Sequence, residues 1–498
     1  MNIAQILTGA AAHYQSKPLL RFRGEDVHYG NFVTQTDALT GALLARGIGP
    51  DCRVLILARN SPQWLVTLFA ALRTGALVVP VNPALTASEV GYILGHAKPS
   101  LVVLDADLRN VLPPGSRDFE RLEIGENKSG SWFEALAAAT PSQLTAERDA
   151  EDPALMFYTS GTTGRPKGAV LSHRAEQFTA ELVAHHYRLG TGDISLIASS
   201  LSFIYPLVID CLASILAGAT VVLQERFHPE IALRGIEAER ATIFMGVPTM
   251  YSMMLDWAEG KQVDVLSLRF GVSAGQNLPW DIVQRFRKRF GVPVYDLWGQ
   301  TEGTPITGYQ PDIEPEGRPE SCGRVLPGCA VRVVDDNGRD LPPGEVGEVL
   351  LTGPNVFLGY YDNSAATAET LRDGWVYTGD LGRLDEDGYL YIVGRKRDMV
   401  IRGGANIYPS EIEEVIYRHP AVQDCAVIGV PDALYGERVK AFVVSVSGQE
   451  VEADAILDHC RVHLAPYKVP SEIAFLDALP LGPTGKILKR VLREREIG

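Results

Sequence analysis

Residues 158–168 read YTSGTTGRPKG and directly follow an apolar run at 154–157. The segment holds three glycines, four Ser or Thr hydroxyls and two cations. Glycines let backbone amides approach an anion, hydroxyls donate to phosphate oxygens, and cations add charge. It is not a Walker A loop, because no Gly-Lys-Ser/Thr follows four residues after a glycine. Its composition predicts a phosphate-binding loop, with a polar surface loop as the alternative.

Short apolar runs alternate with helical patterns on both sides of this loop. Ser61 before Pro62, and the capping-box pair Thr86 and Glu89, mark the starts of two helices. The alternation resumes with strands and helices expected at 242–246, 249–257, 268–273, 281–290 and 293–298. This pattern predicts parallel sheets covered by helices, with ligands bound at the carboxyl ends of the strands.

The chain of 498 residues is too long for a single hydrophobic core, and its pattern of expected helices and strands changes twice. From about Val331, short strands and Gly/Pro/Asp turns predict a small β subdomain. After the charged run 395–398, a separate pattern of helices and strands follows. We therefore expect an α/β fold with two domains. Residues 1–394 form a large N-terminal domain of helix-covered, largely parallel sheets plus the β subdomain, and residues 395–498 form a small α+β C-terminal domain.

Composition narrows the class of protein. The chain is 46% hydrophobic and 21% charged with a net charge of −15, which fits a globular protein and argues against nucleic acid or an anionic membrane as partner. Six cysteines form no CxxC pair, so no disulfide framework or zinc site is expected. The apolar run 194–209 is short and contains Pro206, so it predicts a buried strand and helix. Residues 1–20 carry no secretory pattern, and we expect a cytoplasmic protein without stable membrane insertion.

Five further motifs follow the loop: WGQTE at 298–302, YTGD at 377–380, GRKRD at 394–398, GGANIYP at 403–409 and PTGK at 483–486. Together they resemble, in order, the motifs of the adenylate-forming superfamily, which includes acyl-CoA synthetases, nonribosomal peptide adenylation domains and luciferases. The resemblance covers essentially the whole chain. It implies an AMP-forming ligase. A carboxylate attacks ATP to give an acyl-adenylate and pyrophosphate, and a thiol then takes the acyl group and releases AMP.

The resemblance also implies roles for single residues. Lys486 contacts the carboxylate and α-phosphate, Glu302 holds Mg²⁺ with the Thr159 hydroxyl nearby, and Asp380 accepts the ribose hydroxyls. Arg395 donates to the ribose, and Trp298 packs on the adenine where the family more often has Tyr. The implied nucleotide site comprises Thr159, Ser160, Gly161, Thr162, Thr163, Gly164, Lys167, Ser273, Ala274, Gly275, Trp298, Gly299, Gln300, Thr301, Asp380, Arg395 and Lys486.

In the family the small domain rotates between the two half-reactions. The corresponding hinge position is Arg397, where the family usually has Asp or Lys. Gly403 and Gly404 then match the loop that lines a tunnel for the pantetheine arm of coenzyme A. Only residues 487–498 follow Lys486, so we expect a freestanding enzyme that uses coenzyme A. A carrier protein as the thiol acceptor is the alternative, and a homodimer is left open.

The segment Ser202-Phe203 is followed by Ile204, where peptide-type members place an Asp that binds the amino group. An apolar residue cannot pair an ammonium, so α-amino acids are not expected. Many acyl-CoA synthetases have His at position 203, and Phe is a departure. The expected acyl pocket comprises Phe203, Ile204, Tyr205, Val247 and Gly275. Its apolar character favours an aromatic or aliphatic monocarboxylate.

Two other classes of function compete with this interpretation. Residues 271–275 read GVSAG, the pattern of a serine hydrolase nucleophile elbow, with His419, His459 and His463 available downstream. A hydrolase would not explain the phosphate loop, and in the adenylating family this segment matches the adenine-side loop. The other alternative is a member of the family that binds nucleotide or acyl-CoA without turnover.

Overall fold

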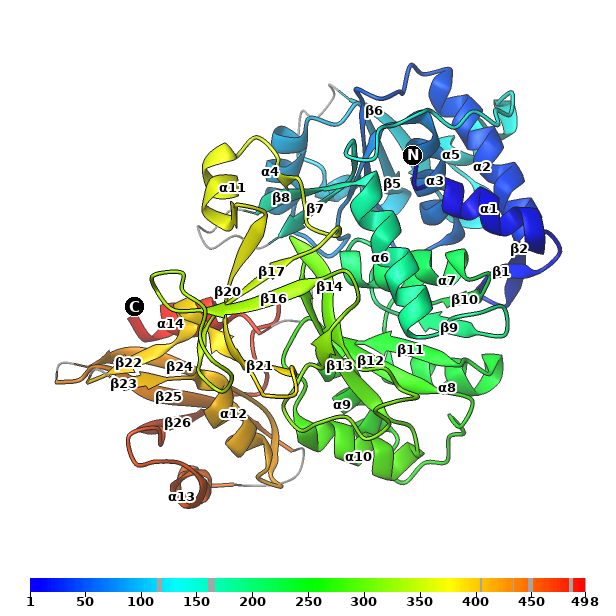
Figure 1. The fold of residues 1–498 in the computed structure, drawn as a ribbon. Coiled ribbons are helices and arrows are strands. Elements are labelled where there is room, and N and C mark those ends of the chain that lie inside the picture. The colour runs from blue at the N-terminus through cyan, green and yellow to red at the C-terminus, as the bar shows by residue number, and fades with distance from the viewer. Residues whose placement is uncertain are drawn as a thin grey trace.

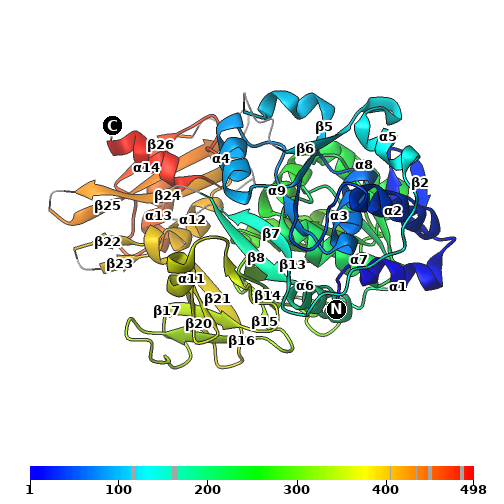
Figure 2. The ribbon, with the colours of Figure 1, turned by 90° about the horizontal axis from the view of Figure 1, so that it is seen from above.

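The computed structural model describes residues 1–113, 119–159, 166–403, 405–432, 434–446, 451–482 and 487–497. Within these residues the strands form four sheets, two large ones in the N-terminal part and two of five strands each. In Figure 1 the last segments of the chain, drawn in orange and red, lie to one side of the rest. The view from above in Figure 2 has the same separation. The predicted α/β class is confirmed.

The larger sheet has nine strands around a parallel centre. Its order is β15 (Arg324–Val325), β14 (Gly303–Gly308), β13 (Val294–Gln300), β12 (Phe270–Ala274), β11 (Ile243–Gly246), β9 (Ile194–Ile197), β10 (Thr220–Leu223), β1 (Pro18–Phe22) and β2 (Glu25–His28). The strands from β13 to β1 are parallel, and β14, β15 and β2 are antiparallel to their neighbours. The carboxyl ends of β12 and β13 therefore lie at one edge.

The second large sheet has seven strands, two of which flank the predicted phosphate loop. Its order is β18 (Gly359–Tyr360), β8 (Lys167–Ser172), β7 (Pro153–Thr159), β4 (Leu77–Pro80), β3 (Arg53–Leu57), β5 (Leu101–Asp105) and β6 (Glu120–Ile124). The strands from β7 to β6 are parallel. Strand β8 is antiparallel to β7, and β18 is antiparallel to β8. The loop thus leaves the carboxyl end of a parallel strand, as the sequence predicted.

Helices cover both large sheets because each sheet has two apolar faces to bury. Those of the N-terminal part are α1 (Gln5–Tyr14), α2 (Tyr29–Leu44), α3 (Pro62–Thr74), α4 (Ala87–Ala97), α5 (Ser131–Ala138), α6 (His173–His186), α7 (Ala213–Leu216), α8 (Pro229–Glu239), α9 (Pro248–Trp257), α10 (Trp280–Phe290) and α11 (Ser364–Thr370). The main core joins the facing sides of the two sheets through α2, α3, α6 and α7. Helices α8, α9 and α10 cover the far side of the nine-stranded sheet, and α4 covers that of the other.

Local signals set the starts of two of these helices. The Ser61 hydroxyl accepts from the Trp64 amide at 3.2 Å, and Thr86 and Glu89 form both bonds of a capping box. These predictions are confirmed. The apolar run 194–209 forms the buried strand β9 and the start of a buried helix, but residues Tyr205–Leu212 are a π-helix. In the part of the chain that the structure describes, no helix combines the length and apolarity of a membrane span.

Two smaller sheets complete the fold. One contains β16 (Ala330–Val334), β17 (Gly347–Thr352), β20 (Trp375–Leu384), β19 (Leu371–Arg372) and β21 (Leu390–Arg395). The C-terminal sheet contains β23 (Ala405–Ile407), β22 (Val400–Arg402), β25 (Gly436–Ser445), β24 (Val422–Asp432) and β26 (Glu472–Phe475), with helices α12 (Pro409–Tyr417), α13 (Ala453–His463) and α14 (Lys489–Ile497). Strand β21 extends one residue past the predicted boundary and includes Arg395.

The C-terminal part touches the N-terminal part through polar side chains. Arg418 forms an ion pair of 3.1 Å with Glu320, and Gln423 Nε2 donates to Asp256 Oδ2 at 3.4 Å. The Arg418 and Glu320 side chains are each about half exposed. Because exposed ion pairs contribute little and are screened by salt, these contacts orient the two parts without locking them.

Candidate active site

The ends of the phosphate loop are placed by a hairpin of β7 and β8, in which Thr159 lies opposite Lys167. The expected phosphate-binding residues Ser160, Gly161, Thr162, Thr163 and Gly164 lie outside the described residues, as do Lys486 and Gly404. Of the predicted phosphate-binding residues in this loop, the structure therefore places Thr159 and Lys167. Both lie at the carboxyl edge of the seven-stranded sheet.

Glu302 follows β13 at the turn into β14, where Gln300 pairs with Gly303. Its side chain is nearly buried, and Oε1 accepts the Tyr360 hydroxyl at 2.6 Å. The Lys167 ammonium lies 4.8 Å from the centroid of the same tyrosine ring. Burial, and then the charge of Glu302, raise the pKa of Tyr360 well above its ordinary value. Tyr360 thus joins two predicted site residues from different sheets, and the sequence analysis did not select it.

Asp380 gathers three other predicted residues. Its side chain is 5% exposed, and Arg395 Nε lies 2.8 Å from Oδ1. Trp298 Nε1 donates to Oδ2 at 3.1 Å, and Gln300 Nε2 donates to the same oxygen at 2.9 Å. The indole of Trp298, which we expected only to pack on adenine, therefore also holds the carboxylate. Motifs at 298–302, 377–380 and 394–398 meet at one anion.

The local backbone fixes this carboxylate. The Thr378 hydroxyl donates to the Val349 carbonyl at 2.6 Å and accepts from the Asp380 amide at 3.0 Å. Between them Gly379 has φ +69°, a left-handed conformation that suits glycine. A Cβ at Gly299 would lie 3.0 Å from Thr304 Cα, so the adjacent motif needs glycine for close approach. Thr301, the remaining residue of that motif, lies in the turn before Glu302.

The segment 273–275 ends β12 beside this cluster. Ser273 is fully buried, and in the described part of the chain its Oγ has no hydrogen-bond partner. His459 is bonded within its own domain, where Nε2 donates to the Val415 carbonyl at 3.0 Å, and its ring packs against His419. Among the described residues Ser273 forms no hydrogen bond to a histidine, so their geometry gives the hydrolase interpretation of GVSAG no support. Ala274 is the last residue of the strand, and Gly275, with φ +86°, is the first residue after it.

The expected acyl pocket borders the same strand. The Tyr205 hydroxyl donates to the Val272 carbonyl at 2.9 Å, and the Tyr251 hydroxyl donates to it at 3.0 Å. Val247 is the N-cap of α9, which carries Tyr251. Ile204 is buried, and Phe203 and Val247 are partly exposed. The segment 203–205 and the start of α9 are thus both tied to β12 next to Gly275.

The domain junction is held by charges on either side of Arg397, which is itself exposed. Lys396 Nζ lies 2.9 Å from Asp336 and 3.2 Å from Glu348 of the N-terminal part. Asp398 lies 2.8 Å from Arg493 of α14. Beyond the junction, the Gly403 amide donates to the Tyr435 carbonyl at 2.8 Å, with φ +58° at the glycine.

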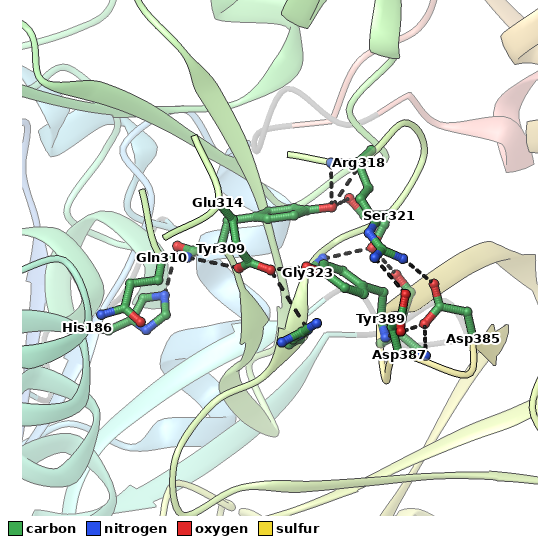
Figure 3. Close-up of polar contacts among 12 residues, drawn as sticks. His186, Tyr309, Gln310, Glu314, Arg318, Ser321, Gly323, Asp385, Asp387 and Tyr389 are labelled. Carbon is green, nitrogen blue, oxygen red and sulfur yellow. Dashed lines mark hydrogen bonds and ion pairs between the residues drawn. The ribbon is translucent and has the colours of Figure 1, made fainter. Parts of the chain in front are cut away.

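A polar network braces the segment between Glu302 and the junction. Figure 3 shows Arg318 facing Asp385 and Asp387, at 3.0 and 2.7 Å, beside the ring of Tyr389. The Tyr389 hydroxyl donates to Glu314, and its ring lies 3.8 Å from the Arg318 guanidinium carbon. The network joins the loop after β14 to the turn between β20 and β21.

Comparison with known proteins then decides the family. The model of the AMP-binding enzyme family matches residues 7–361, and that of its C-terminal domain matches residues 411–486. The chain belongs to this family. It is an adenylate-forming acid–thiol ligase of the acyl-CoA synthetase type, which uses ATP and coenzyme A.

Relatives of this AMP-binding enzyme cover nearly its whole length. A feruloyl-CoA synthase from an Amycolatopsis species is 36% identical over 477 residues, which is 96% of this chain and 95% of that protein. An indoleacetate–CoA ligase of Aromatoleum aromaticum is 34% identical over 501 residues, covering 99% and 98%. The anthranilate CoA ligase AuaEII, in complex with anthranoyl-AMP, has a TM-score of 0.93 at 29% identity, covering 100% of this chain and 97% of that one.

The ATP-bound structure of MatB from Rhodopseudomonas palustris is also similar to this chain. It has a TM-score of 0.91 at 32% identity, covering 99% of both chains. The apo structure of the same protein has a TM-score of 0.82. The arrangement of this chain is therefore more similar to the nucleotide-bound structure.

Proposed function

We propose that this enzyme adenylates an aromatic or aliphatic monocarboxylic acid with ATP and transfers the acyl group to coenzyme A. The observation that carries the proposal is the convergence of Trp298, Gln300 and Arg395 on Asp380. A carboxylate held in this way can accept ribose hydroxyls, and the half-exposed Arg395 can donate to the ribose. Lys167, across from Thr159, supplies positive charge at the phosphate loop.

The residues around Glu302 suit Mg²⁺. No group of three or more His, Cys, Asp or Glu that could hold a metal is found among the described residues. Magnesium is commonly held by one or two carboxylates together with substrate phosphates, so a single carboxylate and a hydroxyl are a suitable protein contribution. Glu302 and Thr159 would hold the ion, with Glu302 Oε1 engaged by Tyr360 and Oε2 left to face it. When bound, the ion would offset the charge of the phosphates.

For the first half-reaction, Lys486 is proposed to meet the carboxylate and the α-phosphate, where two anions approach. Its neighbours belong to the C-terminal lobe, since Leu481 and Ile487 form a bridge and α14 follows. We place this lobe at residues 395–498, with the hinge at Arg397. The flanking ion pairs of Lys396 and Asp398, which reach opposite sides of the junction, support that position.

For the second half-reaction, the loop at Gly403 and Gly404 is proposed to admit the pantetheine arm. Gly403 needs its left-handed conformation, and the neighbouring Tyr435 side chain is about half exposed. A side chain at the glycine positions would fill this path. We prefer coenzyme A over a carrier protein as the thiol acceptor, because the relatives that align over nearly the full chain are named as a CoA synthase and a CoA ligase.

The acid is proposed to be apolar at the end that enters the pocket. Ile204 is 8% exposed and cannot pair an ammonium, which argues against α-amino acids. The names of the feruloyl-CoA and indoleacetate relatives, and the anthranoyl-AMP in AuaEII, favour an aromatic ring. Tyr205, whose hydroxyl donates to the Val272 carbonyl, would supply an aromatic ring to such a pocket.

A panel of carboxylic acids tests the function, scored for AMP release that requires both ATP and coenzyme A. Ferulic, indoleacetic and anthranilic acids are compared with fatty acids of several lengths and with phenylalanine. We expect an aromatic or aliphatic monocarboxylate to turn over, and phenylalanine to fail. If every acid fails while ATP binds, the alternative of a binding protein without turnover is correct.

A further inference from the structure

Tyr360 lies between the two charges of the proposed phosphate site. Its hydroxyl donates to Glu302 Oε1 at 2.6 Å, and its ring lies 4.8 Å from the Lys167 ammonium. We propose that Tyr360 is a positioning residue, which keeps Glu302 and Lys167 separately available for Mg·ATP without touching the reacting atoms. This inference rests on the proposed function.

The backbone holds Tyr360 on both sides. Its strand pairs with β8, where Tyr360 lies opposite Ala169. The Tyr360 amide donates to the Thr367 hydroxyl at 2.8 Å. One residue on, the Tyr361 amide donates to the Gly168 carbonyl at 2.8 Å. Three residues before, the Phe357 amide donates to the Glu302 carbonyl at 3.0 Å. The segment is thus bonded to the phosphate-loop strand and to the Glu302 turn.

This placement solves an electrostatic problem. A lysine and a glutamate in one half-buried site attract each other, and an ion pair between them would occupy both groups before the nucleotide arrives. The tyrosine ring offers the ammonium a π face, and its hydroxyl gives the carboxylate a charge-assisted hydrogen bond. Lys167 therefore keeps its donors for phosphate, and Glu302 keeps Oε2 for the cation.

The substitution Tyr360→Phe removes only the hydroxyl and leaves the ring under Lys167. ATP binding is measured by calorimetry, once with Mg²⁺ and once with EDTA. We expect Tyr360→Phe to weaken binding roughly tenfold with Mg²⁺, as for one hydrogen bond to a charged group, and to change it little with EDTA. The matched control is Tyr361→Phe, because the Tyr361 ring packs on His96, 5.5 Å away, and not on Glu302. That control should bind as the wild type does.

Two further variants separate the ring from the hydroxyl. Tyr360→Leu removes the face under Lys167 as well, so ATP binding should weaken in EDTA too. In a double-mutant cycle, Tyr360→Phe should have little further effect once Glu302 is Gln, because its hydroxyl acts through that carboxylate. In steady-state assays, the KM for Mg·ATP should rise in Tyr360→Phe while the KM for coenzyme A stays unchanged. Thermal melting confirms that each variant is folded.

Two results would overturn the inference. One is a Tyr360→Phe enzyme that keeps the full Mg²⁺-dependent gain in ATP affinity. The other is an equal loss from Tyr360→Phe in the Glu302→Gln background, which would mean that the hydroxyl acts elsewhere. Failure of the proposed function is distinguishable, since it would appear as an acid panel without AMP release, whereas the inference is read from the Mg²⁺ dependence of ATP binding alone.

Discussion

The exchange Asp380→Asn tests whether one carboxylate organises the nucleotide site. Oδ1 lies 2.8 Å from Arg395 Nε, while Oδ2 accepts from Trp298 and Gln300 at 3.1 and 2.9 Å. Asparagine keeps the shape but replaces one oxygen with a donor. In one orientation its NH₂ faces the Arg395 guanidinium, and in the other it faces two donors. At least one donor therefore loses its acceptor in either orientation.

The contacts set the size of the effect. A buried donor left without a partner costs about 1–3 kcal/mol, whereas an ion pair with a half-exposed arginine contributes about 1 kcal/mol or less. The amide should therefore keep its oxygen toward Trp298 and Gln300 and give up Arg395. Because only the Arg395 ion pair is lost, we expect the free energy of unfolding to fall by about 1 kcal/mol or less. The KM for ATP should rise more, by roughly ten- to a hundredfold, because the ribose loses its anionic acceptor and Arg395 its anchor.

Asp193→Asn is the matched control. Asp193 is 9% exposed and accepts from a partly exposed arginine, Arg269, at 2.9 and 3.0 Å. It precedes β9 and so lies at the amino ends of the parallel strands, whereas the site lies at their carboxyl ends. Urea denaturation should therefore show similar losses of stability in both variants, and pyrophosphate exchange should show a raised KM for ATP only in Asp380→Asn. Equal KM values in the two variants would refute the proposed role of Asp380.

Three other predictions concern Lys486, Ile204 and Glu176. Lys486→Ala should abolish pyrophosphate exchange but spare thioester formation from supplied acyl-adenylate, and equal loss of both half-reactions would contradict its assignment. Ile204→Asp should begin to admit amino-bearing acids, and a substrate panel with unchanged preference would remove Ile204 from the pocket. Glu176 is fully buried, and burial raises its pKa from 4.5 to about 8. The folded state then binds the extra proton, so the wild type should lose stability as pH rises from about 4.5 to 8. Glu176→Gln should remove that loss, by a few kcal/mol at most at pH 8, in urea titrations at several pH values. Parallel stability profiles of Glu176→Gln and the wild type would contradict this.

Local features of the fold could be predicted because their causes are local. The caps at Ser61 and Thr86 depend on side chains within three residues of the helix start, and both are confirmed. The π-helix Tyr205–Leu212 was not predicted, because an apolar run has no periodicity that separates one helix type from another. The pairing of β18 with β8 was also missed. Almost two hundred residues separate these strands, and no local signal links them.

In the site, too, the sequence predicts which residues take part but not which contacts they make. Motifs select Asp380, Arg395 and Trp298 as residues, but their hydrogen bonds depend on packing between distant strands. Trp298 was expected to pack on adenine, and its indole N–H is seen to bond Asp380 because β13 brings it within 3.1 Å. Tyr360 belongs to none of the motifs used in the sequence analysis, and only the three-dimensional contact with Glu302 draws attention to it.

If the hinge lies at Arg397 as proposed, the charges at positions 395, 396 and 398 explain how the C-terminal lobe could move and leave the nucleotide site intact. Arg395 pairs with Asp380 in the ladder of β20 and β21, and Lys396 is bound to Asp336 and Glu348 of the same part. Asp398 is bound instead to α14, which follows the segment containing Lys486. A rotation at Arg397 would therefore carry Lys486 away with Asp398 while Arg395 stays with Asp380. The ribose would keep its proposed partners as Lys486, the proposed catalytic lysine, leaves, so the acyl-adenylate could be held in place while the thiol enters.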